Sequence, residues 1–187
     1  LRLQQKTYLD HVISQGDYEY LIRRLKEDGE LTFCFIVRFL AATGVRVSEL
    51  VSLQAEDAAQ GFRDIYSKGG KMRRIYFPES LRQEALPWLQ EAGLNTGFIF
   101  TNRRGAPITP RGIHSQLKVL AKRYGIPEKT VYPHAFRHRF AINFLDKFND
   151  ISLLADLLGH DSVETTKIYL TKSSEEQREL IDSIVTW

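Results

Sequence analysis

A histidine and an arginine stand three residues apart in the segment Pro-His134-Ala-Phe-Arg137-His138. The proline predicts that a helix begins here, so this spacing places both side chains on one face near a helix N-terminus, where the potential is positive. An imidazole and a guanidinium directed at one point suit a phosphate group. His138 lies four residues after His134 and competes for the same face. A zinc-binding histidine pair is the other interpretation, but the glutamate of an HExxH motif is absent and we set it aside.

Three further side chains have types that suit phosphate chemistry. Arg46 follows the helix stop at Gly44, and Glu49 lies three residues later on the same helical face, where it can hold the guanidinium. Taken alone, this pair is typical of a structural ion pair. His160 follows a Leu-Leu-Gly helix end, and Tyr169 comes nine residues later. A single tyrosine at helical spacing is usually a core or boundary residue.

Positive charge is concentrated in the middle of the chain. The 187 residues carry 26 Lys and Arg against 23 Asp and Glu, a net charge of +3, yet residues 62–147 alone hold 16 basic and 6 acidic side chains. A basic block in a near-neutral chain indicates a surface for a polyanion such as nucleic acid. Scattered solvated faces are the alternative for any one cluster. The candidate DNA contacts are Lys71, Arg73, Arg74, Arg103, Arg104, Arg111, Lys118, Lys122, Arg123 and Arg139.

The elements that must position these residues are mostly helical. We predict helices over residues 17–28, 31–43, 47–53, 79–91, 109–125, 133–147, 151–158 and 163–170. Ser173 and Glu176 have the spacing of a capping box that begins a terminal helix. Residues 62–67 and 72–77 are predicted strands joined by a Lys68-Gly-Gly-Lys71 turn, and 98–100 is a candidate third strand. The predicted fold is mainly α with a small antiparallel β-sheet, an α+β architecture.

Composition excludes several classes of protein. The length fits one domain with a buried core, at a stretch two. The single cysteine, Cys34, excludes an internal disulfide bond and a multi-cysteine metal site. No apolar stretch is long enough to span a bilayer and no signal-peptide pattern opens the chain, so we expect a soluble, cytoplasmic protein without a membrane partner. The chain begins at Leu1, which suggests a fragment of a longer protein.

Taken together, the motifs resemble the catalytic domain of the tyrosine recombinase (phage integrase) family. The segments that carry the resemblance are Ala-Thr-Gly-Val-Arg46-Val-Ser-Glu-Leu, the Lys68-Gly-Gly-Lys hairpin, His134-x-x-Arg137-His, Leu-Leu-Gly-His160 and the step to Tyr169. The resemblance implies the DNA breaking-rejoining catalytic fold over residues 1–172 and a C-terminal tail helix over 173–187 that docks on a neighbouring protomer. It also implies an N-terminal DNA-clamp domain that is absent from this chain. Packing of the tail on its own protomer is the alternative.

The resemblance also implies a role for each site residue. Tyr169 is the nucleophile, Arg46 and Arg137 bind the phosphate, His134 is the general base, His160 bonds a phosphate oxygen, Lys68 is the general acid and Glu49 supports Arg46. Lys71 is the alternative to Lys68, because Ser67-Lys68-Gly-Gly-Lys71 departs from the family's usual Gly-Lys-Gly-x-Lys. Cationic side chains take the place of Mg²⁺, and a 3′-phosphotyrosyl bond conserves the energy of the cleaved linkage. We therefore expect no metal, cofactor or ATP.

The expected function is that of a site-specific DNA recombinase or integrase that integrates or excises a mobile element. The resemblance implies a bacterial or phage-encoded protein at the nucleoid, which forms a tetramer on double-stranded DNA and is a monomer when isolated. A type IB topoisomerase shares the same active-site chemistry, and a catalytically silent DNA-binding module would use the same basic block. The presence of all six active-site residues favours an enzyme, and the chain length and the contexts of Arg46 and His160 favour the recombinase.

Overall fold

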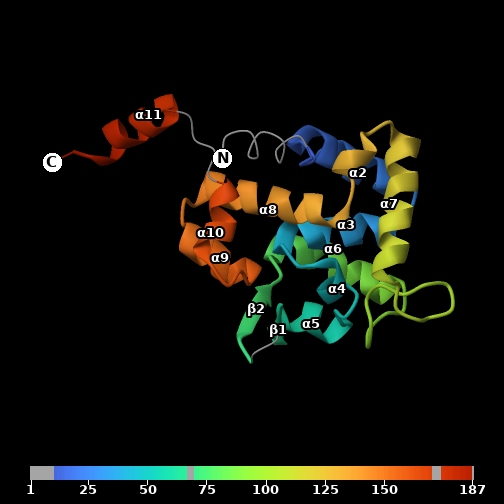
Figure 1. Ribbon diagram of the computed structural model, residues 1–187. Coiled ribbons are helices and arrows are strands. Elements are labelled where there is room, and N and C mark those ends of the chain that lie inside the picture. Colours follow the sequence, from blue (N-terminus) through green and yellow to red (C-terminus); the bar gives the residue numbers. More distant parts are fainter. Residues whose placement is uncertain (1–10, 67–69, 170–173, 187) are drawn as a thin grey trace.

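The computed structural model describes residues 11–66, 70–169 and 174–186, and it is mainly helical with one β-hairpin (Figure 1). The elements, in chain order, are α2 (Gln15–Glu27), α3 (Leu31–Thr43), α4 (Val47–Leu50), α5 (Ala55–Gln60), β1 (Phe62–Tyr66), β2 (Met72–Tyr76), α6 (Glu79–Glu91), α7 (Pro110–Tyr124), η1 (Glu128–Thr130), α8 (Pro133–Lys147), α9 (Ile151–Leu158), α10 (Val163–Thr166), η2 (Lys167–Tyr169) and α11 (Ser174–Ile184). This architecture confirms the predicted fold class.

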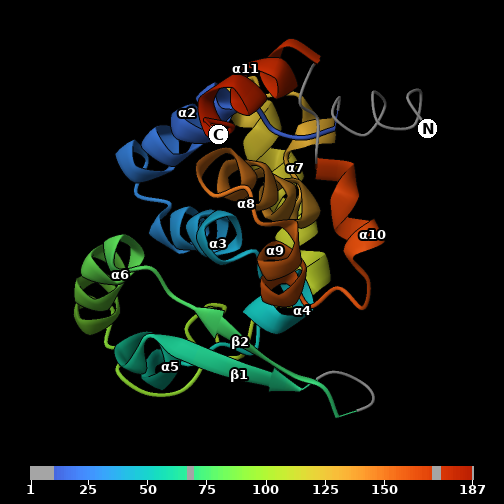
Figure 2. The same ribbon diagram turned by 90° about the vertical axis from the view of Figure 1, so that its left-hand side faces the viewer.

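Helix α3 forms the centre of the main hydrophobic core. Its nearly continuous apolar sequence is buried along most of its length, including Cys34, Phe39 and Leu40. Helix α8 packs alongside it, and both views show the two helices side by side (Figures 1 and 2). Helix α3 ends at Gly44, which adopts the left-handed conformation with φ +66°. The stop predicted from the sequence is therefore the turn that leads into Arg46.

The hairpin is antiparallel, and its register places Ile65 opposite Arg73 and Arg63 opposite Ile75. Strand β1 contacts α5 and strand β2 contacts α9, so the hairpin links the core to the last third of the chain. Residues 68 and 69 of the predicted turn Lys68-Gly-Gly-Lys71 lie outside the described residues, as does residue 67, the predicted end of the first strand. Within the described residues the sheet has two strands. The candidate third strand is instead a single bridge between Phe98 and Gln54.

The last third of the chain forms a smaller hydrophobic cluster beside the first. Ala141 and Leu145 of α8 pack with Leu154 and Leu158 of α9 and with Tyr169. The predicted helix over 163–170 is instead the short α10 followed by the 3₁₀ turn η2, and residue 170 lies outside the described residues. Helix α11 lies apart from the other helices in Figure 1. The predicted boundary between domain and tail also lies outside the described residues, as does the capping residue Ser173.

Two short elements differ from the sequence-based expectation. The predicted helix over 47–53 ends at Leu50, and a separate helix, α5, follows it. The break arises because Gln54 begins a new capping box, in which its backbone N–H donates to Asp57 Oδ2 over 2.8 Å. The neighbouring N–H of Ala55 donates to the carbonyl of Gly97.

Within the described part of the chain, none of the helices combines the length and the apolarity that crossing a membrane requires.

Candidate active site

Three arginines from three different elements converge on the C-terminal end of α9. The carbonyls of residues 157, 158 and 159 accept their hydrogen bonds one after another: Arg73 Nη1 donates to the first over 2.7 Å, Arg137 Nη2 to the second over 2.7 Å and Arg46 Nη2 to the third over 3.3 Å. These carbonyls lack partners within the helix and form the negative end of its dipole. The arrangement concentrates positive charge at the turn before His160.

Arg137 is the most deeply buried of the three, with 2% of its surface exposed. Its Nη1 donates to the carbonyl of Gly44, so the guanidinium joins the end of α3 to the end of α9. Burial, together with the positive charges of Arg46 and Arg73, lowers the pKa of Arg137 to about 10. The side chain therefore remains charged at neutral pH. Two of its five N–H donors are used by these carbonyls, and a phosphate oxygen is a suitable acceptor for the others.

Glu49 is shared between two of these arginines. Its Oε1 accepts from Arg46 Nη1 over 3.2 Å, and its Oε2 accepts from the backbone N–H of Arg46 over 2.8 Å and from Arg73 Nη2. Burial raises the pKa of the Glu49 carboxyl, but the hydrogen bonds and charges of Arg73 and Arg46 outweigh it and the pKa is lowered. The sequence predicted the Arg46–Glu49 pair but not the contribution of Arg73.

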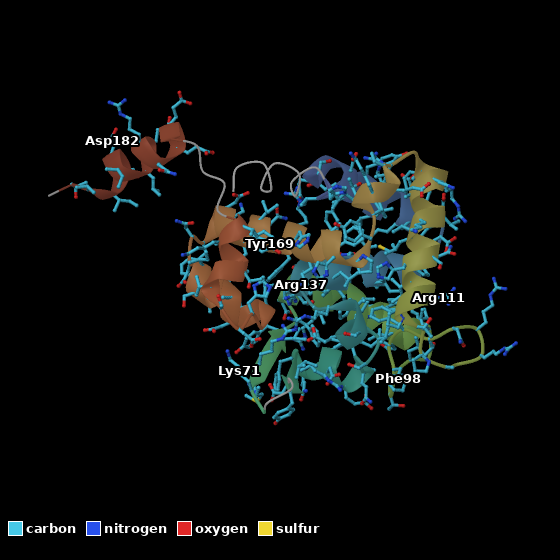
Figure 3. All side chains as sticks on the ribbon, viewed as in Figure 1. Lys71, Phe98, Arg111, Arg137, Tyr169 and Asp182 are labelled. Carbon is cyan, nitrogen blue, oxygen red and sulfur yellow. The ribbon has the colours of Figure 1, made fainter. Side chains whose placement is uncertain are left out.

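The hydroxyl of Tyr169 lies against α8. Tyr169 is 5% exposed, and its hydroxyl lies 2.5 Å from Nδ1 of His138. Burial lowers the pKa of His138 to about 3, and the charges of His134 and Arg137 act in the same direction. With its proton on Nε2, the neutral imidazole accepts a hydrogen bond from the phenol. Tyr169 also interacts electrostatically with Arg137, and the two are labelled near each other in Figure 3.

His134, the predicted general base, contacts His138, which in turn contacts Tyr169. Its ring meets that of His138 edge-on, with centroids 4.9 Å apart and planes at 88°. Desolvation lowers the pKa of His134, followed in effect by the charges of Arg137 and Arg46. From the sequence, His138 is predicted only as a competitor for the same face. The spacing of four residues placed it there, but its contact with Tyr169 depends on how the chain returns from α9.

His160 faces the same cluster from the other side of the turn. Its Nδ1 lies 2.8 Å from Oγ1 of the buried Thr166. Burial lowers the pKa of His160 to about 4, and the charges of Arg137 and Arg46 lower it as well. In the tautomer in which Thr166 donates to Nδ1, the proton is on Nε2 and is available to a phosphate oxygen. The sequence carried no signal for Thr166 beyond its place on a short helix.

A groove of about 560 Å³ lies between the hairpin and α9, beside these arginines. Arg46, Arg73 and Lys71 line it, together with exposed apolar side chains of the hairpin, Met72 and Tyr76. Figure 3 shows Lys71 near the end of the hairpin. Lys68, the predicted general acid, lies outside the described residues. Residues of both the hairpin and the arginine cluster line the groove.

The ten candidate DNA contacts differ in their surroundings. Five of them are exposed side chains: Lys71, Arg103, Arg104, Arg111 and Lys118. The other five hold protein groups: Arg73 as above, Arg74 with Asp64, Lys122 with Glu128, Arg123 with Glu30, and Arg139 with the carbonyl of Ile13. Arg111 on α7 lies across the body from Tyr169 in Figure 3. The roles of all ten in DNA binding remain predictions.

Comparison with known proteins agrees with the fold described above. The described fold superposes on the crystal structure of XerA recombinase with a TM-score of 0.74 and 28% sequence identity, over 94% of this chain and 64% of that one. It also superposes on the Tn1549 transposon integrase in complex with transposon right end DNA, with a TM-score of 0.77, 18% identity and coverage of 94% and 66%. The helical fold, the hairpin and the arginine–histidine–tyrosine cluster define a tyrosine recombinase catalytic domain.

Sequence relatives identify the family. Tyrosine recombinase XerC of Staphylococcus haemolyticus is 32% identical over 95% of this chain, and tyrosine recombinase XerD of Listeria monocytogenes is 38% identical over 72%. The matched parts are 62% and 48% of those proteins, so the chain spans about half to three fifths of the relatives it matches. The model of the phage integrase family matches residues 11–176. The chain belongs to the phage integrase family.

Proposed function

We propose that this chain is the catalytic part of a site-specific tyrosine recombinase that cleaves and rejoins DNA. The observation that carries the proposal is the meeting of Arg46, Arg137 and His160 at the end of α9, with the hydroxyl of Tyr169 held beside the same cluster by His138. Phosphoryl transfer of this kind needs positive charge where the phosphorane forms, a nucleophile and a proton acceptor. The cluster contains all three.

The proposed reaction begins with attack of Tyr169 Oη on the phosphorus of a DNA phosphodiester. The Tyr–O–P bond forms, the bond from phosphorus to the 5′ oxygen breaks, and the 5′ oxygen leaves as a hydroxyl after it takes a proton. Arg46 and Arg137 balance the negative charge that develops on the non-bridging oxygens. Attack by the 5′-hydroxyl of another strand reverses these steps and joins the strands. Each linkage is exchanged for one of similar energy, so the cycle requires no ATP.

The remaining roles are proposed from the family resemblance. His134 is the general base, His160 donates to a phosphate oxygen and Lys68 protonates the leaving 5′ oxygen. The basic side chains named above as candidate DNA contacts bind the phosphates of double-stranded DNA. We further propose a tetramer on DNA, with α11 docked on a neighbouring protomer. In support, Ile181 and Ile184 on α11 and the adjacent Val185 are exposed.

The cellular role that we propose is integration or excision of a mobile element. The test uses nicked suicide duplexes tiled across both ends of the element that encodes the protein, in which cleavage releases a short strand and traps the adduct. The full-length protein and its Tyr169→Phe variant are incubated with them in EDTA. Wild type alone should form a protein–DNA adduct that resists denaturation, on a duplex that spans an element end.

Two outcomes would replace this proposal. Relaxation of supercoiled plasmids without an element end, at a rate that matches cleavage, would indicate a type IB topoisomerase. Tight binding with no adduct on any duplex would indicate a catalytically silent DNA-binding module. Loss of DNA binding in Tyr169→Phe to the same degree as loss of cleavage would show that Tyr169 has a structural role.

A further inference from the structure

Arg73 occupies an unusual place for a residue of a basic hairpin. It stands on β2, two residues after Lys71, but only 11% of its side chain is exposed. Its guanidinium donates to the carbonyl of Leu157 over 2.7 Å and to Oε2 of Glu49. Strand β2, the end of α9 and the start of α4 therefore meet at this one side chain.

We propose that Arg73 is a positioning residue for cleavage, which neutralises Glu49 and holds the end of α9 so that Arg46 remains available to the DNA phosphate. This inference rests on the proposed recombinase function. It assigns Arg73 a role different from the direct DNA contact that the basic cluster of the hairpin predicts.

The charges around Glu49 support this role. Arg46 and Arg73 share one carboxylate, and the side chain of Arg46 is 39% exposed whereas that of Arg73 is covered. Arg73 is therefore the partner that can balance Glu49 permanently, and Arg46 is the partner that can turn to a substrate. Without Arg73, the carboxylate would be balanced by Arg46 alone, and the field of Arg46 at a bound phosphate would be largely cancelled.

The packing around Gly159 gives a second, independent observation. A Cβ atom at Gly159 would lie 2.5 Å from Cδ and 2.6 Å from Nε of Arg73, and the backbone there has φ +67°. The side chain of Arg73 thus passes directly over the turn between α9 and His160. An alanine at this position would force Arg73 away from Glu49 and Leu157 without altering any charge.

The test measures the cleavage rate at saturating DNA and the affinity for DNA as a function of salt, with the full-length protein on the duplex that gives the adduct. Arg73→Gln should slow cleavage by about tenfold or more, which corresponds to about 1.4 kcal/mol in the barrier. The affinity for DNA and its dependence on salt should stay unchanged. A direct phosphate contact would instead weaken binding and reduce the slope of log K against log salt by about 0.9.

Three further variants separate positioning from loss of structure. Arg63→Gln is the matched control, because Arg63 lies on the same face of the same hairpin and is 27% exposed, but pairs with Asp57 over 2.8 Å rather than with Glu49. It should leave the cleavage rate unchanged. Arg73→Lys should recover part of the rate that Arg73→Gln loses. Gly159→Ala should slow cleavage as Arg73→Gln does, and it serves as the probe if Arg73→Gln fails to fold.

The decisive comparison is the double variant Arg73→Gln/Glu49→Gln. Removal of the carboxylate as well should make the double variant faster than Arg73→Gln alone, because Arg46 is again uncompensated. Equal rates for wild type and Arg73→Gln, or a double variant slower than both single variants, would overturn the inference. Absence of an adduct with wild type would instead refute the proposed function, so the two failures can be distinguished.

Discussion

Gly44 is the position where the fold and the site depend most directly on one missing side chain. It ends α3 with φ +66°, and its carbonyl accepts a hydrogen bond from Arg137. A Cβ atom there would lie 2.6 Å from Cδ1 of Phe140 and 2.8 Å from Cδ2 of Leu158. Both neighbours are packed apolar side chains, so Gly44→Ala must strain the backbone and displace part of the core.

Gly125 offers a matched comparison. It ends α7 with φ +67°, and a Cβ atom there would meet no heavy atom within 4 Å. Gly125→Ala should therefore lower the free energy of unfolding only by the cost of a left-handed alanine, about 1–2 kcal/mol. Gly44→Ala carries the same cost plus that of overpacking, about 1–3 kcal/mol. We expect it to be the more destabilising of the two by about 1–3 kcal/mol.

Urea titrations of the two variants, followed by far-UV circular dichroism, measure this difference if the slope m is unchanged. The adduct assay adds a second readout, because Gly44→Ala should also slow cleavage through the displaced carbonyl under Arg137, whereas Gly125→Ala should not. Equal losses of stability for the two variants would refute the close packing at Gly44. An unchanged cleavage rate in Gly44→Ala would refute its connection to Arg137.

Three other predictions follow from the site. A lysine at position 137 cannot reach both carbonyls, so Arg137→Lys should lower the free energy of unfolding by about 1–3 kcal/mol and the cleavage rate by about 100-fold or more. Urea titration and adduct formation measure the two effects, and wild-type values for both would contradict the role of the guanidinium in joining these carbonyls. The pKa of His138 is about 3 in the folded protein against an ordinary 6.5, so its contribution to stability is complete above 6.5 and declines as the pH falls toward 3. Between pH 7 and pH 5, the free energy of unfolding of wild type should fall by about 2 kcal/mol more than that of His138→Gln. An equal fall in the two proteins would show that His138 is not held neutral. Arg111→Gln should reduce the salt slope of DNA binding by about 0.9, and an unchanged slope would exclude it from the DNA surface.

The ends of several helices could be predicted from the sequence because local chemistry determines them. Helix α9 begins where Asp150 accepts from the N–H of Leu153 and ends at Gly159, and both features are visible in the sequence. Helices α3, α6 and α8 also have the predicted bounds. The start of α5 was missed, although Gln54 and Asp57 have capping-box spacing, because the surrounding residues show no clear apolar periodicity.

The sequence predicted which residues come together at the site more completely than it predicted the contacts that hold them. Arg46, Glu49, Arg137, His160 and Tyr169 meet as the motif pattern suggested. The partners that hold them could not be predicted, because they come from contacts between residues far apart in the chain. Neither spacing nor charge in the sequence distinguishes Arg73, which is covered by the end of α9, from exposed lysines and arginines nearby.

The identity of the residue that becomes joined to DNA tests the central claim most directly. The adduct trapped on the nicked duplex is digested with nuclease and trypsin, and the modified peptide is identified by mass spectrometry. Trypsin cuts after Lys167 and Lys172, so Tyr169 lies in the peptide Ile-Tyr-Leu-Thr-Lys. Our account predicts a nucleotide remnant on Tyr169 of this peptide, formed in the presence of EDTA. An adduct on any other residue would contradict it.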